Sequence, residues 1–305
     1  MHFDIDSHLI FETVLGSHAY GTNTEKSDVD LRGVCIPPQE VALSLFKKFD
    51  QFEDKENDRV IFSLAKFFKL ARDCNPSILE LLFVDQKMWK MCTGEWRVII
   101  ENREMFLSKR IRHSFAGYAA SQLKRMRTHV QWMAKAPKEP KPEYYGVEHK
   151  MFLGNNEIGA FDYLEEHGIE FTKEIVELMS KVKAYKHAVN DYNNYQTWKK
   201  ERNSSRAELE KKYGYDTKHA MHLVRLSLQG EELLMTGEMV VCDRPDKDML
   251  VEVRDGGWSY EKLLEFAEDI DKRMEVAADK SLLPDSPNEA EIDNLYLDLV
   301  FNICL

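Results

Sequence analysis

The chain has 305 residues, a formal net charge of −11 and a hydrophobic fraction of 43%. This length allows one large or two moderate domains, each with its own core. The acidic balance argues against a protein that nucleic acid covers over its whole surface. No apolar run approaches the roughly 20 residues of a membrane helix, and Met1 to Asp4 do not resemble a signal peptide. With five scattered cysteines and no C-x-x-C pair, we expect a cytoplasmic protein with no membrane partner.

The first third of the chain predicts a compact α/β module that ends at residue 107. Apolar runs over 9–15 and 31–36 predict two strands, and Pro37-Pro38 ends the second because proline cannot donate to a strand ladder. A charged, turn-like patch over 50–58 precedes a short buried strand at 58–64. The remaining predicted elements are a helix over 65–73, a helix that begins after Asn75 with Pro76 in its first turn, and an edge strand over 84–91.

The remainder, residues 108–305, predicts a mainly helical domain, which makes the whole chain an α+β protein. The proline-rich stretch 136–142 must be extended because it interrupts helical periodicity. Residues 239–242 and 249–253 are expected to pair as a small hairpin. The predicted helices cover 108–134, 157–166, 172–194, a segment that starts at Ser205, 216–236, 259–278 and a last short segment before the C-terminus.

The most informative stretch runs from Gly16 to Asp30 and reads G-S-H-A-Y-G-T-N-T-E-K-S-D-V-D. Strand alternation places residues i and i+2 on one side, so Asp28 and Asp30 are expected to project together. Two adjacent carboxylates repel each other unless a cation lies between them. Hard oxygen ligands of this kind suit Mg²⁺, which proteins bind through one or two carboxylates together with substrate phosphates.

The glycine and serine that open this stretch predict a phosphate cradle. Gly16 lets the backbone approach a ligand closely, and Ser17 begins a short helix whose free N–H groups attract anions. The alternatives are a turn glycine and a helix N-cap without a ligand. A phosphate cradle joined to an acidic pair contains the working parts of a phosphoryl-transfer site.

These residues resemble the signature of the DNA polymerase β-type nucleotidyltransferase superfamily, G-S followed by S-D-x-D-L. The wider blocks, Gly16 to Thr22 and Ser27 to Gly33, are similar to the branch of predicted nucleotidyltransferases associated with RNA ligases. The resemblance implies a polymerase β-type catalytic module with nucleotide contacts from Gly16, Ser17 and Ser27. Later blocks agree with it, namely Asn75-Pro76 with Glu80-Leu81-Leu82, Lys218 to Leu226, and Leu283-Pro284.

In such folds a third carboxylate on a neighbouring strand completes the metal site. By similarity we assign that role to Asp58, and Asp50, Glu53 and Asp54 are the alternatives. Asp28, Asp30 and Asp58 are thus the expected catalytic and metal-binding residues, with Mg²⁺ or Mn²⁺ as the cofactor and a nucleoside triphosphate as the substrate.

A cationic stripe is predicted on the helix over 216–236. Lys218, His222 and Arg225 are spaced at i, i+4 and i+7, so they share one face that could hold triphosphate oxygens. The alternative is a solvated basic face. Arg32 shares the face of Asp28 and Asp30, and it either touches a phosphate or forms an ordinary ion pair. His219 with His222 lacks a third ligand for a metal site.

Residues 103–150 are locally basic despite the acidic chain. Within them, the helix over 108–134 carries a row of cations with Tyr118 and nearby Trp132, which could follow an RNA backbone and stack a base. A solvated helix face is the alternative. The candidate RNA contacts are Lys109, Arg110, Arg112, Lys124, Arg125 and Arg127.

The sequence therefore predicts a metal-dependent nucleotidyltransferase that transfers NMP from an NTP to a hydroxyl and releases pyrophosphate. The acceptor implied by the resemblance is an RNA end, with an RNA ligase or other RNA-repair enzymes as partners. The alternatives are a catalytically silent RNA-binding or adaptor protein and an enzyme that nucleotidylates proteins. Glu80, among leucines, is interpreted either as an internal salt-bridge partner or as a helix-face acid.

Overall fold

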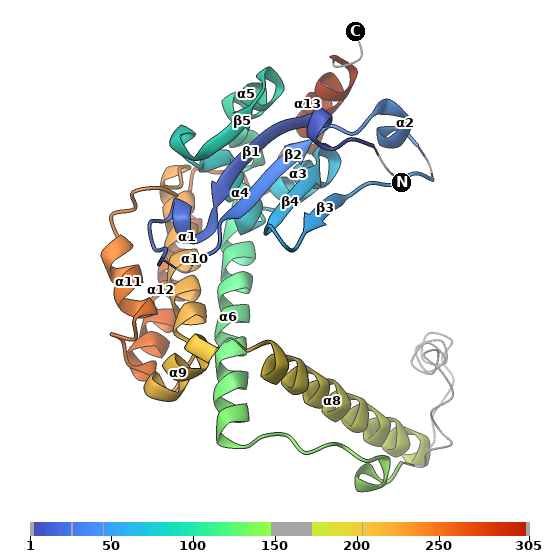
Figure 1. Ribbon diagram of the computed structural model, residues 1–305, viewed down its shortest axis with the longest axis vertical. Coiled ribbons are helices and arrows are strands. Elements are labelled where there is room, and N and C mark those ends of the chain that lie inside the picture. Colours follow the sequence, from blue (N-terminus) through green and yellow to red (C-terminus); the bar gives the residue numbers. More distant parts are fainter. Residues whose placement is uncertain (1–2, 26, 45, 148–172, 203, 303–305) are drawn as a thin grey trace. The chain divides into compact units, whose positions relative to one another are not determined.

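A mixed sheet forms the centre of the N-terminal region in the computed structural model, which describes residues 3–25, 27–44, 46–147, 173–202 and 204–302 (Figure 1). Its strands follow the order β3-β4-β2-β1-β5. Strands β2 and β4 pair in parallel, and the other neighbouring pairs are antiparallel. The strands are β1 (Leu9–Leu15), β2 (Asp30–Cys35), β3 (Gln51–Asp54), β4 (Arg59–Ser63) and β5 (Trp89–Cys92).

Strand β1 is an interior strand that lies between β2 and β5. Its side chains are buried on both faces of the sheet. Phe11, fully buried, stacks on Trp96 with ring centroids 4.1 Å apart. On the neighbouring strand Trp89 meets the same ring edge-on at 5.6 Å. Burial on both faces explains why β1 has a continuous apolar run rather than a strict alternation.

Helices α3 (Leu64–Arg72), α4 (Pro76–Phe83) and α5 (Gly94–Glu101) pack against the sheet. Ser63, the last residue of β4, caps α3 by accepting a hydrogen bond from the Lys66 N–H at 3.2 Å. Pro76 occupies the first turn of α4, where a missing N–H costs nothing. Shorter helical segments are η1 (Asp6–His8), α1 (Gly16–Ala19), α2 (Gln39–Ala42), η2 (Gln86–Met88) and η3 (Arg103–Phe106).

Helix α10 (Thr217–Thr236) is the core helix of the C-terminal region. The Asp216 carboxylate caps it by accepting from the His219 N–H at 3.0 Å, and Gly237, in the left-handed region, ends it. Gly230 allows close packing, because a Cβ there would lie 2.6 Å from Met274 and 2.9 Å from Phe115. Helices α11 (Lys247–Arg254) and α12 (Tyr260–Lys280) pack against α10. The other long helices of this unit are α6 (Arg110–Ala134), whose last residues belong to the second unit, and α13 (Glu289–Asn302), which packs against α3.

The chain forms two compact units. One contains residues 1–126 together with 213–305, and the other contains residues 127–212. The second unit includes η4 (Pro142–Tyr145), α8 (Lys173–Glu201) and most of α9 (Ser204–Tyr213). Its described part has an aromatic cluster, in which the Trp132 and Trp198 rings lie 5.4 Å apart and Trp132 Nε1 donates to Asp191 at 3.2 Å. The domain boundary expected after residue 107 stays a prediction.

The α+β class is confirmed, while several local expectations change. The patch 50–58 contains β3, because its residues pair with β4. The hairpin of 239–242 with 249–253 is wrong, since the second segment lies in helix α11. Leu250 and Val253, spaced by three residues, are both buried, which is helical rather than strand spacing. The helix expected over 157–166 lies outside the described residues.

None of the helices that the structure describes combines the length and apolar character needed to cross a bilayer. Cys35, Cys74, Cys92 and Cys242 are free thiols.

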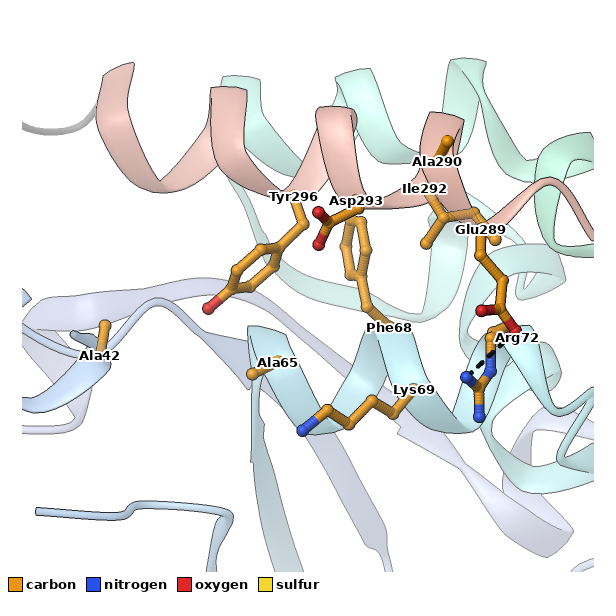
Figure 2. A pocket seen from close by; sticks show the side chains of 10 residues that line it. All are labelled: Ala42, Ala65, Phe68, Lys69, Arg72, Glu289, Ala290, Ile292, Asp293 and Tyr296. Atoms are coloured by element: carbon orange, nitrogen blue, oxygen red, sulfur yellow. Dashed lines mark hydrogen bonds and ion pairs between the residues drawn. The ribbon is translucent and has the colours of Figure 1, made fainter. Parts of the chain in front are cut away.

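A cavity of about 640 Å³ opens between α3 and α13 (Figure 2). Phe68 and Tyr296 form apolar walls, and Arg72 pairs with Glu289 across it at 3.3 Å. None of the predicted site residues lines this cavity. The larger cavity is therefore separate from the signature stretch.

Candidate active site

The signature glycine lies at the end of β1, directly against an acidic residue of β2. Gly16 has a φ of +61°, a conformation that side chains other than glycine rarely adopt. A Cβ at this position would lie 1.9 Å from Oδ2 of Asp30. The antiparallel pairing of Leu15 with Asp30 brings the two segments together. Both the backbone angle and the contact therefore require glycine here.

A second carboxylate lies beside Asp30 because β2 and β4 run in parallel. Leu31 pairs with Arg59, so Asp30 and Asp58, the residues before them, meet at the same end of the sheet. Asp58 has a φ of +45°, and its carbonyl accepts from the Leu31 N–H at 3.0 Å. Asp58 directly precedes β4, the strand that neighbours the strand of Asp30. Its role as a metal ligand stays a prediction.

One guanidinium forms ion pairs with both carboxylates. Arg32 Nη2 donates to Asp30 Oδ1 at 3.2 Å and to Asp58 Oδ1 at 3.1 Å. Arg32 Nη1 also donates to the Asp58 carbonyl at 2.6 Å. Of the two roles considered for Arg32, the ion pair is the one that this structure contains.

The environment of Asp30 favours a nearby cation. Burial raises the pKa of the Asp30 carboxyl, and the negative charge of Asp58 raises it further. The positive charges of Arg32 and Lys218 oppose this effect. A half-buried carboxylate beside a second one is costly to ionise, so a divalent cation would stabilise the charged form of both.

A small cavity of about 170 Å³ borders Asp30. Gly16, Asp30 and Arg32 line one part of it, and Ser77 and Glu80 of α4 line another. Leu15 and Phe62 complete the wall.

The first signature aspartate lies apart from this cavity. Asp28 is exposed and precedes the start of β2. Within the described part of the chain, Asp28, Asp30 and Asp58 do not form a group of three ligand atoms within 4.8 Å of one another. The structure thus brings together Gly16, Asp30, Arg32 and Asp58, whereas Asp28 does not line the small cavity.

The alternatives to Asp58 occupy other positions. Glu53 and Asp54 lie on β3, the edge strand beyond β4. The Asp54 carboxylate accepts from the backbone N–H of Glu56 at 3.0 Å and from Asn57, so it shapes the β3–β4 turn. Asp50 precedes β3, and its carbonyl accepts from the Ser63 N–H at 2.8 Å.

The serines of the signature support the turn around α1. The Ser17 carbonyl accepts from the Thr22 N–H at 2.9 Å, and Ser27 Oγ accepts from the Thr24 N–H at 2.8 Å. His18 Nε2 lies 3.2 Å from the Ser27 carbonyl. These bonds link Ser17 with Thr22, and Ser27 with both Thr24 and His18, in the segment that leads from α1 toward Asp30. Nucleotide contact by Ser17 or Ser27 stays a prediction.

The cationic stripe of α10 divides into residues with different surroundings. Lys218 is exposed, and its positive charge acts to lower the pKa of the Asp30 carboxyl. His222 is half-buried, and His219 Nδ1 lies 2.7 Å from Gln122 Oε1. Arg225, largely buried, pairs with Glu80 at 2.7 Å. Glu80 is therefore an internal salt-bridge partner, which was one of its two interpretations.

Half of the basic residues assigned to RNA have acidic partners within the chain. Lys109 pairs with Asp285 at 3.1 Å, Arg110 approaches Asp73 at 3.9 Å, and Arg112 pairs with Asp271 at 2.8 Å. Lys124, Arg125 and Arg127, further along α6, are exposed. An RNA-binding role for any of the six stays a prediction.

Sequence reasoning did not assign a role to Tyr20, Ser77 or Gln229. Tyr20 is buried and accepts a hydrogen bond from Gln229 Nε2 at 2.8 Å. The only signal for Tyr20 was its place in the signature block. Gln229 is polar and lies among apolar residues of an amphipathic helix, which is a signal for a buried hydrogen bond.

The fold and the site define a class of protein. It is an α+β protein in which a glycine turn and two carboxylates lie at one end of the sheet. Residues 2–145 match the model of the RNA repair pathway DNA polymerase beta family, RlaP. This match to the N-terminal region confirms the resemblance seen in the signature blocks.

One relative among curated proteins is an uncharacterized 38.9 kDa protein of Enterobacteria phage T4. The two are 23% identical over 314 residues, which cover 88% of this chain and 89% of the phage protein. The similarity extends well beyond the 2–145 region, so the helical part is shared too. No solved structure matches the chain.

Proposed function

We propose that this protein is a metal-dependent nucleotidyltransferase that transfers NMP from an NTP to a hydroxyl group, with an RNA end as the acceptor. The observation that carries the proposal is the pair Asp30 and Asp58, gathered against Gly16 and sharing the charge of Arg32. The match to this family supports polymerase β-type chemistry and a role in RNA repair.

The donor set fits Mg²⁺ or Mn²⁺. Asp30 and Asp58 offer hard oxygen ligands, and both carboxylates already pair with Arg32. Asp28 lies two residues before Asp30 in the sequence. A divalent ion held there would stabilise the charges of the triphosphate and lower the pKa of the attacking hydroxyl. Asp28 would have to turn toward Asp30 to join the set.

The remaining residues bind the substrate and move the proton. The acceptor oxygen forms a bond to the α-phosphorus, the bond from that phosphorus to the bridging oxygen breaks, and pyrophosphate leaves. Asp58 accepts the hydroxyl proton. Gly16 and Ser17 amides hold the β- and γ-phosphates, with Ser27 supporting the loop, while Arg32, Lys218 and His222 face the phosphate charge.

The test is incubation of the pure protein with each α-labelled NTP, Mg²⁺ or Mn²⁺, and pooled RNA. We expect label on RNA with the wild-type chain and background label with Asp30→Asn or Asp58→Asn. Asp54→Asn is the matched control, because Asp54 shapes a turn on the same hairpin and does not line the cavity. Undiminished transfer by Asp30→Asn would refute the proposal. Label on protein and none on RNA would identify a protein-nucleotidylating enzyme.

A catalytically silent RNA-binding or adaptor protein is the second candidate. The observation that favours it is that Arg32 forms an ion pair with both Asp30 and Asp58. This candidate predicts no incorporation or NTP hydrolysis under any condition, together with tight, salt-sensitive RNA binding.

A further inference from the structure

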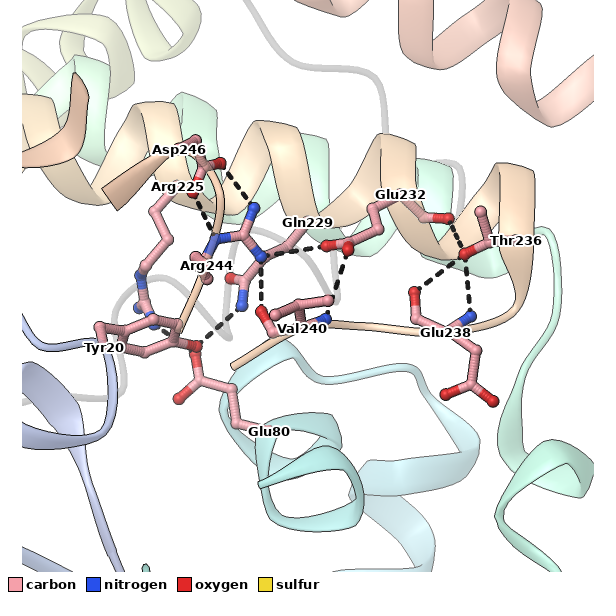
Figure 3. A network of polar contacts seen from close by, with 10 residues as sticks. All are labelled: Tyr20, Glu80, Arg225, Gln229, Glu232, Thr236, Glu238, Val240, Arg244 and Asp246. Atoms are coloured by element: carbon pink, nitrogen blue, oxygen red, sulfur yellow. Dashed lines mark hydrogen bonds and ion pairs between the residues drawn. The ribbon is translucent and has the colours of Figure 1, made fainter. Parts of the chain in front are cut away.

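A buried polar network links the signature turn to helix α10 (Figure 3). Tyr20 caps the end of α1, Glu80 comes from α4 and Arg225 from α10. Arg225 Nη1 donates to Glu80 Oε1 at 2.7 Å, and its guanidinium lies 4.0 Å from the centre of the Tyr20 ring. Gln229, one turn further along α10, donates to the Tyr20 hydroxyl at 2.8 Å. Residues far apart in the sequence therefore meet at one guanidinium.

The network is energetically constrained to a single arrangement. A buried guanidinium is costly unless it is paired, and Glu80 supplies the opposite charge in a site from which water is nearly excluded. The Tyr20 face adds a cation–π contact that depends on the planar shape of arginine. Burial raises the pKa of Tyr20 far above its ordinary value, so its hydroxyl remains protonated. The ring and the carboxylate thus have little freedom to move independently.

Both partners of Arg225 continue into the candidate active site. Glu80 lines the small cavity together with Gly16 and Asp30. Tyr20 follows Gly16, Ser17, His18 and Ala19 in the same turn. A shift of Arg225 would therefore displace the turn through Tyr20 and the cavity wall through Glu80.

We propose that Arg225 is a positioning residue, which holds Tyr20 and Glu80 so that the Gly16 turn and the cavity wall beside Asp30 keep the geometry required for nucleotide binding and transfer. This inference rests on the proposed function and replaces the direct phosphate contact expected for Arg225. Its role resembles that of a supporting shell around a site, where a displacement of about 1 Å can reduce the rate about 10²-fold.

Arg244 provides a matched control within the same region (Figure 3). It is also buried, and it pairs with Glu232 at 3.0 Å and with Asp246 at 2.6 Å. It does not line the small cavity. A lysine at either position keeps the charge and loses the planar fork. Arg225→Lys and Arg244→Lys should therefore cost similar stability, but only Arg225→Lys should disturb the site.

The experiment measures thermal unfolding, the MgATP dissociation constant and the rate of label transfer from α-labelled ATP to pooled RNA, all well below the unfolding midpoint of each variant. For Arg225→Lys we expect kcat/KM to fall about 10²-fold and MgATP to bind more weakly. For Arg244→Lys both quantities should match the wild type. Tyr20→Phe keeps the ring under the guanidinium and should retain most of the activity.

A double variant that removes both charges tests whether low transfer is caused merely by loss of folding. Arg225→Met alone leaves Glu80 buried without its partner and should be strongly destabilised, whereas Arg225→Met with Glu80→Gln should recover much of the stability. Transfer should stay low in the double variant. Restored transfer, or equal losses in Arg225→Lys and Arg244→Lys, would overturn the inference alone. A wild-type chain that neither binds MgATP nor transfers label would overturn the proposed function and the inference with it.

Discussion

Gly16 shows how one residue can be required for two independent reasons. Its backbone has a positive φ, and a Cβ would overlap the Asp30 carboxylate. A sequence motif contains only the identity of the glycine. The structure supplies the reason, which is that the turn and the acidic strand end share the same space.

Replacement of Gly16 by alanine therefore strains the backbone and displaces Asp30. We expect Gly16→Ala to reduce the free energy of unfolding by about 1–3 kcal/mol and to weaken MgATP binding. Denaturant unfolding and calorimetric titration measure the two effects. Gly117→Ala is the matched control, because that glycine lies inside α6 and has open space where a Cβ would lie. This change should stabilise the protein by about 0.5–1 kcal/mol. Equal behaviour of the two variants would contradict the steric account of Gly16.

Arg32 raises a different question at the same scale. The motif S-D-V-D-L-R places a cation two residues after Asp30, and the structure shows that this cation satisfies both carboxylates. The same contact is compatible with an enzyme before it binds metal and with a silent relative. The transfer assay on Asp30→Asn and Asp58→Asn decides between them.

At the scale of elements, α6 has one part paired to acids and one part exposed. Lys109, which precedes the helix, and Arg110 and Arg112 of its first turn form ion pairs with acids of the same unit. The later turns expose Lys124, Arg125 and Arg127. If α6 contacts RNA, the exposed turns are better placed to do so.

Charge reversal on the exposed turns tests this prediction. We expect Arg125→Glu with Arg127→Glu to weaken binding of single-stranded RNA and to reduce the slope of log affinity against log salt concentration by about one per lost phosphate contact. Fluorescence anisotropy over a salt series measures both. Arg97→Glu, an exposed change on α5, serves as the control. An unchanged slope in the double variant would exclude this part of α6 as an RNA contact.

The whole molecule joins distant parts of the sequence into one compact unit. Residues 213–305 belong with residues 1–126, and α13 packs against α3 while α10 supplies Arg225 to Glu80. The catalytic module expected over 1–107 therefore lies in a unit that also contains the C-terminal helices.

A fragment of residues 1–107 should accordingly be less stable than the same region in the full chain. Without α10, the buried Glu80 loses its guanidinium partner, and without α13, the surface of α3 around Phe68 becomes exposed. Circular dichroism during heating should show a lower and less cooperative transition. A fragment that unfolds cooperatively with full stability would instead support an independent domain ending at residue 107.

Local features of this protein were determined by the sequence itself. The helix caps at Ser63 and Asp216, the glycine turn at Gly16 and the periodicity of α6 depend on neighbouring residues, so each could be predicted without the fold. The error at 249–253 arose because a short apolar run fits a strand or a helix equally well until its burial is known.

Only the tertiary structure decided which distant charges meet. The parallel pairing of β2 with β4 places Asp58, rather than Asp54, beside Asp30. Arg225 pairs with Glu80, 145 residues away, and Lys109, Arg110 and Arg112 pair with acids elsewhere in the chain. Such contacts depend on the order of the strands in the sheet and on how the helices pack. Local spacing in the sequence does not determine the distance between two side chains that only the folded core brings together.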